Sequence, residues 1–440
     1  MQVLMSGLSR NAPASFFRRI RILFLPQGSI FYGWWIVAMA AFVMYLGSLF
    51  WMQSYGAYAV VFNREFGWSM TLLSGAFALT RVESGLLGPL QGWMVDRYGP
   101  RLIVSVGLLM LGLGLLWLTQ VETLPVYYLV VFFISFGISL GGFHTLMVSI
   151  VNWFQKHRTK AVALAQLGHS LGGLSVPMLA YGLEQHGWRM MALVSGFTVI
   201  VLGVPLVQGI RHRPEEKGEV MDGDSGRPIS TNVGKENNEI PSASWKDALR
   251  TPAFWLISSA HGIALLSVST VLVHLIPHLT HKLGMGLTEA GLVFSTVSIF
   301  QILGIACGGY LGDRFSKRLI CVYCMIFHGS GMLVLAFFDD YLMLIMFAVL
   351  HGLAWGIRGP QMVAIRADYF GAKSFGKIMG ISSLVVMLGM MGGPLICGLV
   401  VDHFGVYRNA FISIGLISLL GAILFYFARK PDFKVDHEAK

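Results

Sequence analysis

The chain has 440 residues, of which 55% are hydrophobic and only 12% are charged. A soluble globular chain carries roughly a quarter charged residues, so this composition excludes a soluble protein and indicates one surrounded by lipid. The formal net charge of +10 does not indicate nucleic-acid binding, because the basic residues lie in short connections between apolar runs, where membrane orientation places them.

The first 30 residues form a separate basic segment. Arg18, Arg19 and Arg21 precede an apolar run at 22–25, which is too short for the core of a secretory signal and has no small-residue cleavage site after it. We expect residues 1–30 to be cytoplasmic, with the basic stretch lying on the membrane surface.

Twelve apolar segments follow, each close to the roughly 20 residues that a membrane-spanning helix needs. Ser69 and Thr288 are typical helix-start residues and stand before the second and eighth segments. The sequence therefore predicts an all-α membrane protein with twelve transmembrane helices. Their approximate ranges are 32–56, 70–94, 102–121, 125–150, 161–184, 190–209, 254–277, 287–311, 319–337, 341–364, 377–400 and 407–428.

Basic residues occur in every second connection, and this asymmetry sets the orientation of the helices. We expect both termini and the central connection to be cytoplasmic, in a multi-pass protein of the cell membrane (the inner membrane in a Gram-negative bacterium). The basic positions are Arg97, Arg101, Lys156, Arg158, Lys160, Arg211, Arg213, Lys217, Arg314, Lys317, Arg318, Lys373, Lys377, Arg429 and Lys430.

A long polar segment divides the twelve segments into six and six. Its middle, 218–238, is rich in Gly, Ser, Asp, Glu and Lys and predicts a flexible linker. Its end, 244–250, predicts a short amphipathic helix. The predicted organisation is a basic segment over 1–30, a six-helix bundle over 31–210, a cytoplasmic linker over 211–252, a second six-helix bundle over 253–430 and a cytoplasmic tail over 431–440.

A charged turn between the second and third segments recurs between the eighth and ninth. Gly92, Asp96, Arg97, Gly99 and Arg101 define the first copy. The weaker copy lies 217 positions later and contains Asp313 and Arg314, with Ser316 in place of the second glycine. Two such parallel repeats are an architecture of secondary transporters.

The pattern Gly-x-x-x-Asp-Arg-x-Gly-x-Arg in this place resembles the loop between helices 2 and 3 of the major facilitator superfamily, and the resemblance covers 31–430. It implies that the loop pairs with the neighbouring half and helps to hold the outward-facing state, so the residues of both copies are candidate gating residues. Asp96 would meet the positive start of helix 11 near Phe375.

Short segments at helix ends are similar to the monocarboxylate transporter and oxalate–formate antiporter branch. That branch implies small carboxylates as substrates, moved with protons or by exchange. The chain departs from it because helix 8 has no arginine and Lys377 lies only at the entrance of helix 11, so the cationic position has moved or the cargo differs. The similar segments are 66–69, 153–154, 168–173 with Pro177, 187–189 and 249–255.

Arg81 and Glu83 are charges within helix 2, where each costs about 2.5–3.5 kcal/mol on insertion scales. Arg81 lies about 18 Å along the helix from Ser69, near the middle of the membrane. It is a candidate carboxylate clamp; the alternative is an ion pair that holds helix 2 to a neighbour. Glu83 is a candidate for proton coupling, because an apolar site favours a protonated carboxyl. The alternative is a permanent salt bridge, with Arg358 as the candidate partner.

Arg358 lies in helix 10, and the resemblance implies that helices 1, 4, 7 and 10 line the cavity. It is a candidate for substrate contact or gating, with structural pairing as the alternative. Arg366 and Asp368 are nearer the cytoplasmic end, where a gate or a surface pair is expected. Further candidates for substrate binding are His144, His169, His261 and Gln53, with His351 at a similar depth; hydrogen-bonded packing is the alternative for each.

These features predict a secondary active transporter of small organic anions, by proton symport or anion exchange. Its expected partners are the anion, protons or a counter-anion, and the lipid bilayer, with no nucleic acid and a functional monomer. No nucleotide-binding loop, hydrolytic triad or zinc spacing occurs, so we expect no enzyme activity, cofactor or metal site. The alternatives are efflux of amphipathic compounds, suggested by abundant Met and Phe, and a non-transporting sensor on the same fold.

Overall fold

The computed structural model describes residues 31–155, 157–223, 244–371, 374–431 and 433, apart from the side chains of 83–89, 92, 96, 159 and 375. The predictions for residues 1–30, for most of the linker and for most of the tail lie outside the described residues. So do those for Gly92 and for the side chains of Glu83 and Asp96.

The first half of the chain is entirely helical between Tyr32 and Val207, apart from short turns. A π-helical turn interrupts the first crossing, and Gly187 (φ 77°, ψ 161°) breaks α9 and separates the fifth crossing from the sixth. The elements are α2 (Tyr32–Gly47), η1 (Ser48–Met52), α3 (Tyr55–Phe66), α4 (Met70–Tyr98), α5 (Pro100–Leu118), α6 (Leu124–Gly141), α7 (Phe143–Trp153), α8 (Arg158–Leu174), α9 (Val176–Thr198), η2 (Val199–Gly203) and α10 (Val204–Val207).

The second half begins with a short helix and continues with six long ones. Two 3₁₀ turns, η3 (Pro214–Lys217) and η4 (Met221–Gly223), lie at the start of the connection between the halves. The helices are α11 (Trp245–Arg250), α12 (Pro252–Lys282), α13 (Leu287–Arg314), α14 (Lys317–Phe337), α15 (Tyr341–Phe370), α16 (Phe375–Phe404) and α17 (Tyr407–Phe427).

Twelve membrane crossings account for these helices in the described part of the chain. Ten stretches are long and apolar enough to span a membrane; one of them, Lys160–Val207, contains 48 residues and holds the fifth and sixth crossings. The apolar stretch Met70–Val82 belongs to α4 and supplies the remaining crossing. The predicted all-α fold with twelve helices in two bundles is confirmed.

Local capping explains two of the predicted helix starts. Ser69 accepts a hydrogen bond from the Leu72 amide (3.3 Å) at the start of α4, and Ser244 accepts one from the Asp247 amide (3.2 Å) at the start of α11. Both satisfy amide groups that have no partner within the helix. The prediction for Thr288 is wrong, because α13 begins at Leu287 after Gly286, so Thr288 is already helical.

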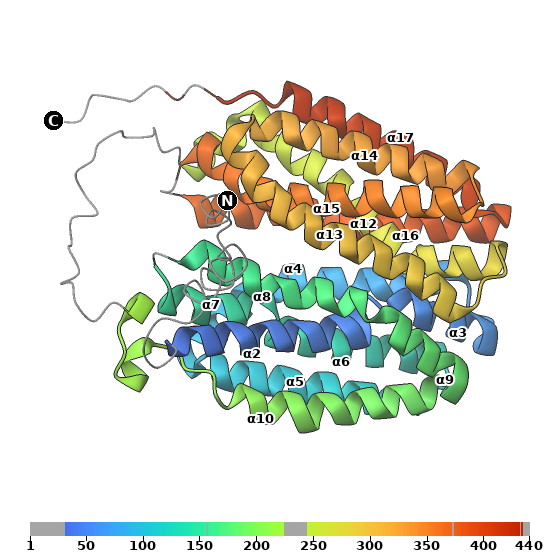
Figure 1. Ribbon diagram of the computed structural model, residues 1–440, viewed down its shortest axis with the longest axis horizontal. Helices are drawn as coiled ribbons and strands as arrows, with labels where there is room; N and C mark the ends of the chain where they lie inside the picture. Colours follow the sequence, from blue (N-terminus) through green and yellow to red (C-terminus); the bar gives the residue numbers. More distant parts are fainter. Residues whose placement is uncertain (1–30, 156, 224–243, 372–373, 432, 434–440) are drawn as a thin grey trace, which may run out of the picture.

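The two halves form two layers of helices. Figure 1 shows α2 to α10 (blue to green) in the lower layer and α12 to α17 (yellow to red) in the upper one. Positive φ angles at Gly67, Gly187, Gly284 and Gly405 mark the turns at one membrane end, which we call the Gly67 end. Gly99, also with positive φ, marks the opposite Gly99 end. Glycine adopts this conformation without the strain that a side chain would add.

Carboxylates from each half cap a helix of the other half at the Gly67 end. Asp402 of α16 accepts hydrogen bonds from the amides of Met70 (3.0 Å) and Thr71 (2.8 Å) at the start of α4. Glu184 of α9 accepts from the Leu287 amide and the Thr288 hydroxyl at the start of α13. A negative charge at a helix start is stabilising. We call these contacts the reciprocal caps.

Close packing joins the halves at the same end. A Cβ atom on Gly56 would lie 2.9 Å from the Leu272 carbonyl oxygen, and one on Gly398 would lie 2.9 Å from that of Met70. One large buried apolar cluster contains residues of both halves. Among the described side chains, the clusters toward the Gly99 end each lie within one half. The halves are therefore held together chiefly at the Gly67 end.

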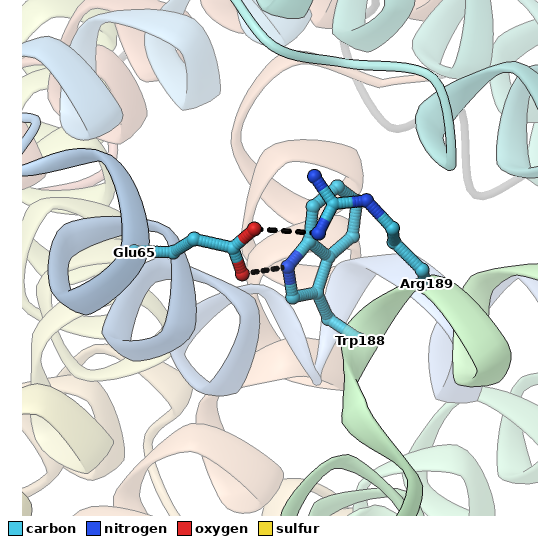
Figure 2. Close-up of polar contacts among 3 residues, drawn as sticks. All are labelled: Glu65, Trp188 and Arg189. Carbon is cyan, nitrogen blue, oxygen red and sulfur yellow. Dashed lines mark hydrogen bonds and ion pairs between the residues drawn. The ribbon is translucent and has the colours of Figure 1, made fainter.

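A further contact at the Gly67 end lies within the first half. Figure 2 shows the carboxylate of Glu65, at the end of α3, facing both Trp188 and Arg189. Arg189 Nη1 lies 2.5 Å from Glu65 Oε1, and the Trp188 indole N–H donates to the other oxygen. The ion pair is partly exposed and contributes at most about 1 kcal/mol, but it fixes the start of the sixth crossing against the first.

Replacing Gly168 by alanine is expected to lower the thermal stability of the purified protein. A Cβ there would lie 1.9 Å from the Ala41 carbonyl oxygen, and overpacking of this kind costs about 1–3 kcal/mol. A Cβ on Gly380 would have no atom within 4 Å, so Gly380→Ala is the matched control and should be neutral or slightly stabilising. Equal unfolding temperatures for both variants in detergent would contradict the close packing of α8 on α2.

Candidate functional site

A cavity of about 490 Å³ lies between the two halves. Its size falls in the range of small-molecule sites. Helices from both halves line it. They include the predicted crossings 1, 4, 7 and 10, and the fifth and eighth crossings line it as well. The lining residues are Met44, Phe143, Gln166, His169, Ser170, His261, Leu265, Gln301, Ile305, Trp355, Gly356, Arg358, Gly359 and Pro360.

Arg358 supplies the only full charge among the described lining residues. The side chain is 1% exposed, and its Nε and Nη1 atoms have no hydrogen-bond partner in the described part of the chain. No Asp or Glu lines the cavity there. A buried guanidinium with unused donors is costly unless something accepts from it, so the cavity is suited to an anion.

His261 lines the cavity together with Arg358, and Arg366 contacts its imidazole ring. Its Nδ1 atom is 3.2 Å from Nη2 of Arg366, a residue that is 1% exposed. The prediction of a surface pair for Arg366 is therefore wrong. The residue is buried because α15 continues to Phe370, and because α12 and α16 cover the side chain and supply its hydrogen-bond partners. Asp368 does form the expected surface pair, with Lys317 at 2.8 Å.

Arg81 lines a smaller cavity of about 150 Å³ inside the first half. Its Nη2 atom is 2.8 Å from the Met52 sulfur, and its guanidinium lies 4.8 Å from the centre of the Phe77 ring. The two cavities share Met44, Phe143 and His169 as lining residues. Arg81 and Arg358 therefore line neighbouring spaces on either side of His169.

Other predicted substrate residues differ in their placement. His169 lines both cavities, and its backbone carbonyl accepts from Ser48 (2.7 Å) and from Gln53 (3.4 Å). Gln53 is fully buried and lines neither cavity, and His144 is exposed beside Phe143 and also lines neither. His351 pairs with His328 (Nδ1 to Nδ1, 3.2 Å) inside the second half.

The described gating candidates lie at the Gly99 end. Arg101 Nε donates to Gln208 (2.9 Å), and Arg97 lies 5.5 Å from the Trp93 ring. Asp313 is exposed, and Arg314 lies 4.3 Å from the Tyr310 ring. Among the described side chains, these gating candidates make no hydrogen bond to the other half.

The reciprocal caps are the contact between halves that sequence reasoning missed. Glu184 and Asp402 end the fifth and eleventh crossings, 218 positions apart, and Met70 and Leu287 begin the second and eighth, 217 apart. The offset of 217 used for the charged turns matches the two helix starts and misses the second carboxylate by one position. Both carboxylates lie at helix ends next to short connections, where the sequence alone does not distinguish a cap on another helix from a solvated charge.

Known proteins similar to this chain include transporters from animals, a fungus and bacteria. A sequence model of the Major Facilitator Superfamily matches residues 23–274 and 257–440. Monocarboxylate transporter 2 of Mesocricetus auratus is 21% identical over 424 residues, which cover 92% of this chain and 85% of that protein. The Fujikurins efflux protein of Gibberella fujikuroi is 23% identical over 415 residues, covering 90% and 82%.

The fold is also that of a solved transporter structure. A bacterial homolog of the human lysosomal transporter Spinster, in an inward-facing and occupied conformation, superimposes with a TM-score of 0.70 at 14% identity. The match covers 91% of this chain and 97% of that one. At this identity the similarity shows the fold alone.

Proposed function

The chain belongs to the major facilitator superfamily, and from this premise we propose that it is a secondary active transporter of small organic anions of the mono- or dicarboxylate class. It is a multi-pass membrane transporter for a small molecule, and its relatives are transporters, not enzymes. The proposal adds the substrate class and the mode, which is alternating access with proton symport or anion exchange.

Arg358 carries the proposal. Its unused N–H groups face a cavity with no described carboxylate, and a guanidinium presents a planar pair of donors that matches a carboxylate. The similarity to monocarboxylate transporter 2 supports the same class. Glu83 remains the proposed site of proton coupling, and Arg81 a proposed second contact for the anion.

The distribution of basic residues supports a proposed orientation. With the basic connections on the cytoplasmic side, both termini are cytoplasmic and the protein lies in the cell membrane. The Gly67 end is then the outer end, closed by the reciprocal caps. Transport requires that the bundles at 31–210 and 253–430 separate there in turn. Each chain contains a complete cavity, which supports function as a monomer.

Uptake by the purified protein in liposomes tests the proposal. A panel of radiolabelled mono- and dicarboxylates is offered with and without a pH gradient, and with and without internal carboxylate. We expect at least one carboxylate to be taken up, faster with the gradient for symport or with internal anion for exchange. No uptake of any carboxylate by protein that reconstitutes intact would overturn the proposal.

Efflux of amphipathic compounds is a second candidate function. The similarity to the Fujikurins efflux protein and the apolar residues of the cavity wall, such as Phe143, Leu265 and Trp355, favour it. It predicts that deletion of the gene sensitises cells to such compounds and that Arg358→Gln does not change this resistance. If the protein transports small organic anions, Arg358→Gln should instead reduce its transport.

A further inference from the structure

Arg366 is a buried cation whose hydrogen-bond partners are all neutral groups. Nη1 donates to the Met362 carbonyl oxygen (2.7 Å), and Nη2 donates to Ser382 Oγ (2.7 Å) and faces His261 Nδ1 (3.2 Å). None of the ion pairs among the described residues includes it. Burying a charge without a counter-charge is costly, so a role beyond packing is expected for this side chain.

The hydrogen bond to His261 fixes which of its nitrogens carries a proton. A guanidinium nitrogen can only donate, so Nδ1 of His261 must accept, and the neutral ring then carries its hydrogen on Nε2. Ser382 holds the guanidinium in place, because its hydroxyl also lies 2.9 Å from that of Ser258. The network therefore starts on α12, crosses α16 and α15, and returns to α12 at His261.

The remaining N–H of His261 is left for the contents of the cavity. His261 lines the cavity together with Arg358, and it makes no other hydrogen bond in the described part of the chain. The charged groups that face it are Arg358 and Arg366 of α15, and the thiol of Cys321 on α14 faces Arg366. No group of the described wall accepts a hydrogen bond from this N–H, so it is available to an acceptor oxygen of a bound anion.

We propose that Arg366 is a positioning residue, which holds His261 as a neutral Nε2–H donor beside Arg358 so that one charged and one neutral donor bind the same organic anion. This inference rests on the proposed function and assigns one donor group to each of the two oxygens of the carboxylate. His261 then does not carry a symported proton, because Arg366 already occupies the nitrogen that would accept it.

Two amide replacements of His261 test this assignment. The glutamine amide reaches the position of Nε2, whereas the asparagine amide reaches that of Nδ1. With a carboxylate identified in the liposome panel, His261→Gln should keep KM within about threefold, and His261→Asn should raise it by about tenfold, the loss of one hydrogen bond to a charged group. Equal KM values for the two variants would overturn the proposal. His186→Asn, at an exposed histidine, is the control.

Substitutions of Arg366 and a direct measurement of the tautomer separate positioning from packing. Lysine also donates, so Arg366→Lys should retain uptake, whereas Arg366→Met should raise KM about tenfold. Nitrogen NMR of histidine-labelled protein, with the His261→Gln spectrum subtracted, should show an unprotonated Nδ1 in the unmodified protein and mixed tautomers in Arg366→Met.

The NMR measurement needs no substrate, so the two proposals can fail separately. A protonated Nδ1 in a protein that transports carboxylates would overturn the positioning role and leave the proposed function standing. An unprotonated Nδ1 in a protein that transports no carboxylate would support the hydrogen-bond assignment and overturn the proposed function.

Discussion

Replacement of Arg358 by glutamine is expected to reduce carboxylate uptake by about 10- to 100-fold. Glutamine retains a hydrogen-bond donor but removes the charge, and a hydrogen bond to a charged group contributes about 1.5–3 kcal/mol, where each 1.4 kcal/mol is a factor of ten. Arg358→Lys keeps the charge without the planar pair of donors, so its uptake rate should lie between those of the unmodified protein and Arg358→Gln. The measurement is initial uptake into liposomes at several concentrations of the anion.

The matched control for Arg358 is another arginine of the second half. Arg250 is exposed at the end of α11, so Arg250→Gln should leave uptake unchanged. If Arg358→Gln transported carboxylates as fast as Arg250→Gln at low substrate concentration, the guanidinium would not bind the anion. Because Arg358 is fully buried, the unfolding temperature of each variant is measured first, to confirm that the reduced uptake is not a loss of folded protein.

Simultaneous replacement of Asp402 and Glu184 by alanine is expected to open the Gly67 end. Each cap contributes about 1 kcal/mol, so loss of both shifts the equilibrium between closed and open forms by roughly 30-fold, since 1.4 kcal/mol is tenfold. Ser74 lies buried between the halves, 3.0 Å from His274. In a background without native cysteines, Ser74→Cys should react with a membrane-impermeant thiol reagent about 30-fold faster in the double variant.

A third carboxylate at the same end provides the control. Asp339 pairs with Lys282 at 2.6 Å, and both residues belong to the second half. Asp339→Ala therefore removes a carboxylate without touching the contact between halves, and the labelling rate should not change. The caps lie on different helix pairs, so the single variants should each give about a fivefold increase, and the effects should add as free energies. Unchanged labelling in the double variant would show that packing alone closes this end.

The sequence was sufficient for the fold because lipid imposes a simple rule on it. Each crossing must be long and apolar, and the charges must collect in alternate connections. Ser69 and Ser244 add local capping, which depends only on neighbouring residues. Thr288 is the exception. The residue before α13 is Gly286, which has no side chain that could cap the helix, and the helix begins at Leu287, one residue before Thr288.

The candidate site was only partly predictable, because side-chain partners come from other helices. The depth of Arg358 and His261 in their segments placed them correctly near the cavity. The same reasoning misplaced Arg366, since a position late in a helix does not reveal that α12 and α16 cover it. Gln53 has a suitable depth but turns toward the His169 carbonyl, a direction set by the packing of α8 against η1, which directly precedes Gln53.

The reciprocal caps also have a consequence for the order in which the protein is made. The Leu287 amide appears 103 residues after its acceptor, Glu184, so that cap can form at once. The Thr71 amide must wait for Asp402, which is synthesised 331 residues later. At about 5–20 residues per second, this delay is roughly 15 to 65 s. The amides at the start of the second crossing thus lack their cap until almost the whole chain has been synthesised. Closure of this end is therefore a late step of biosynthesis.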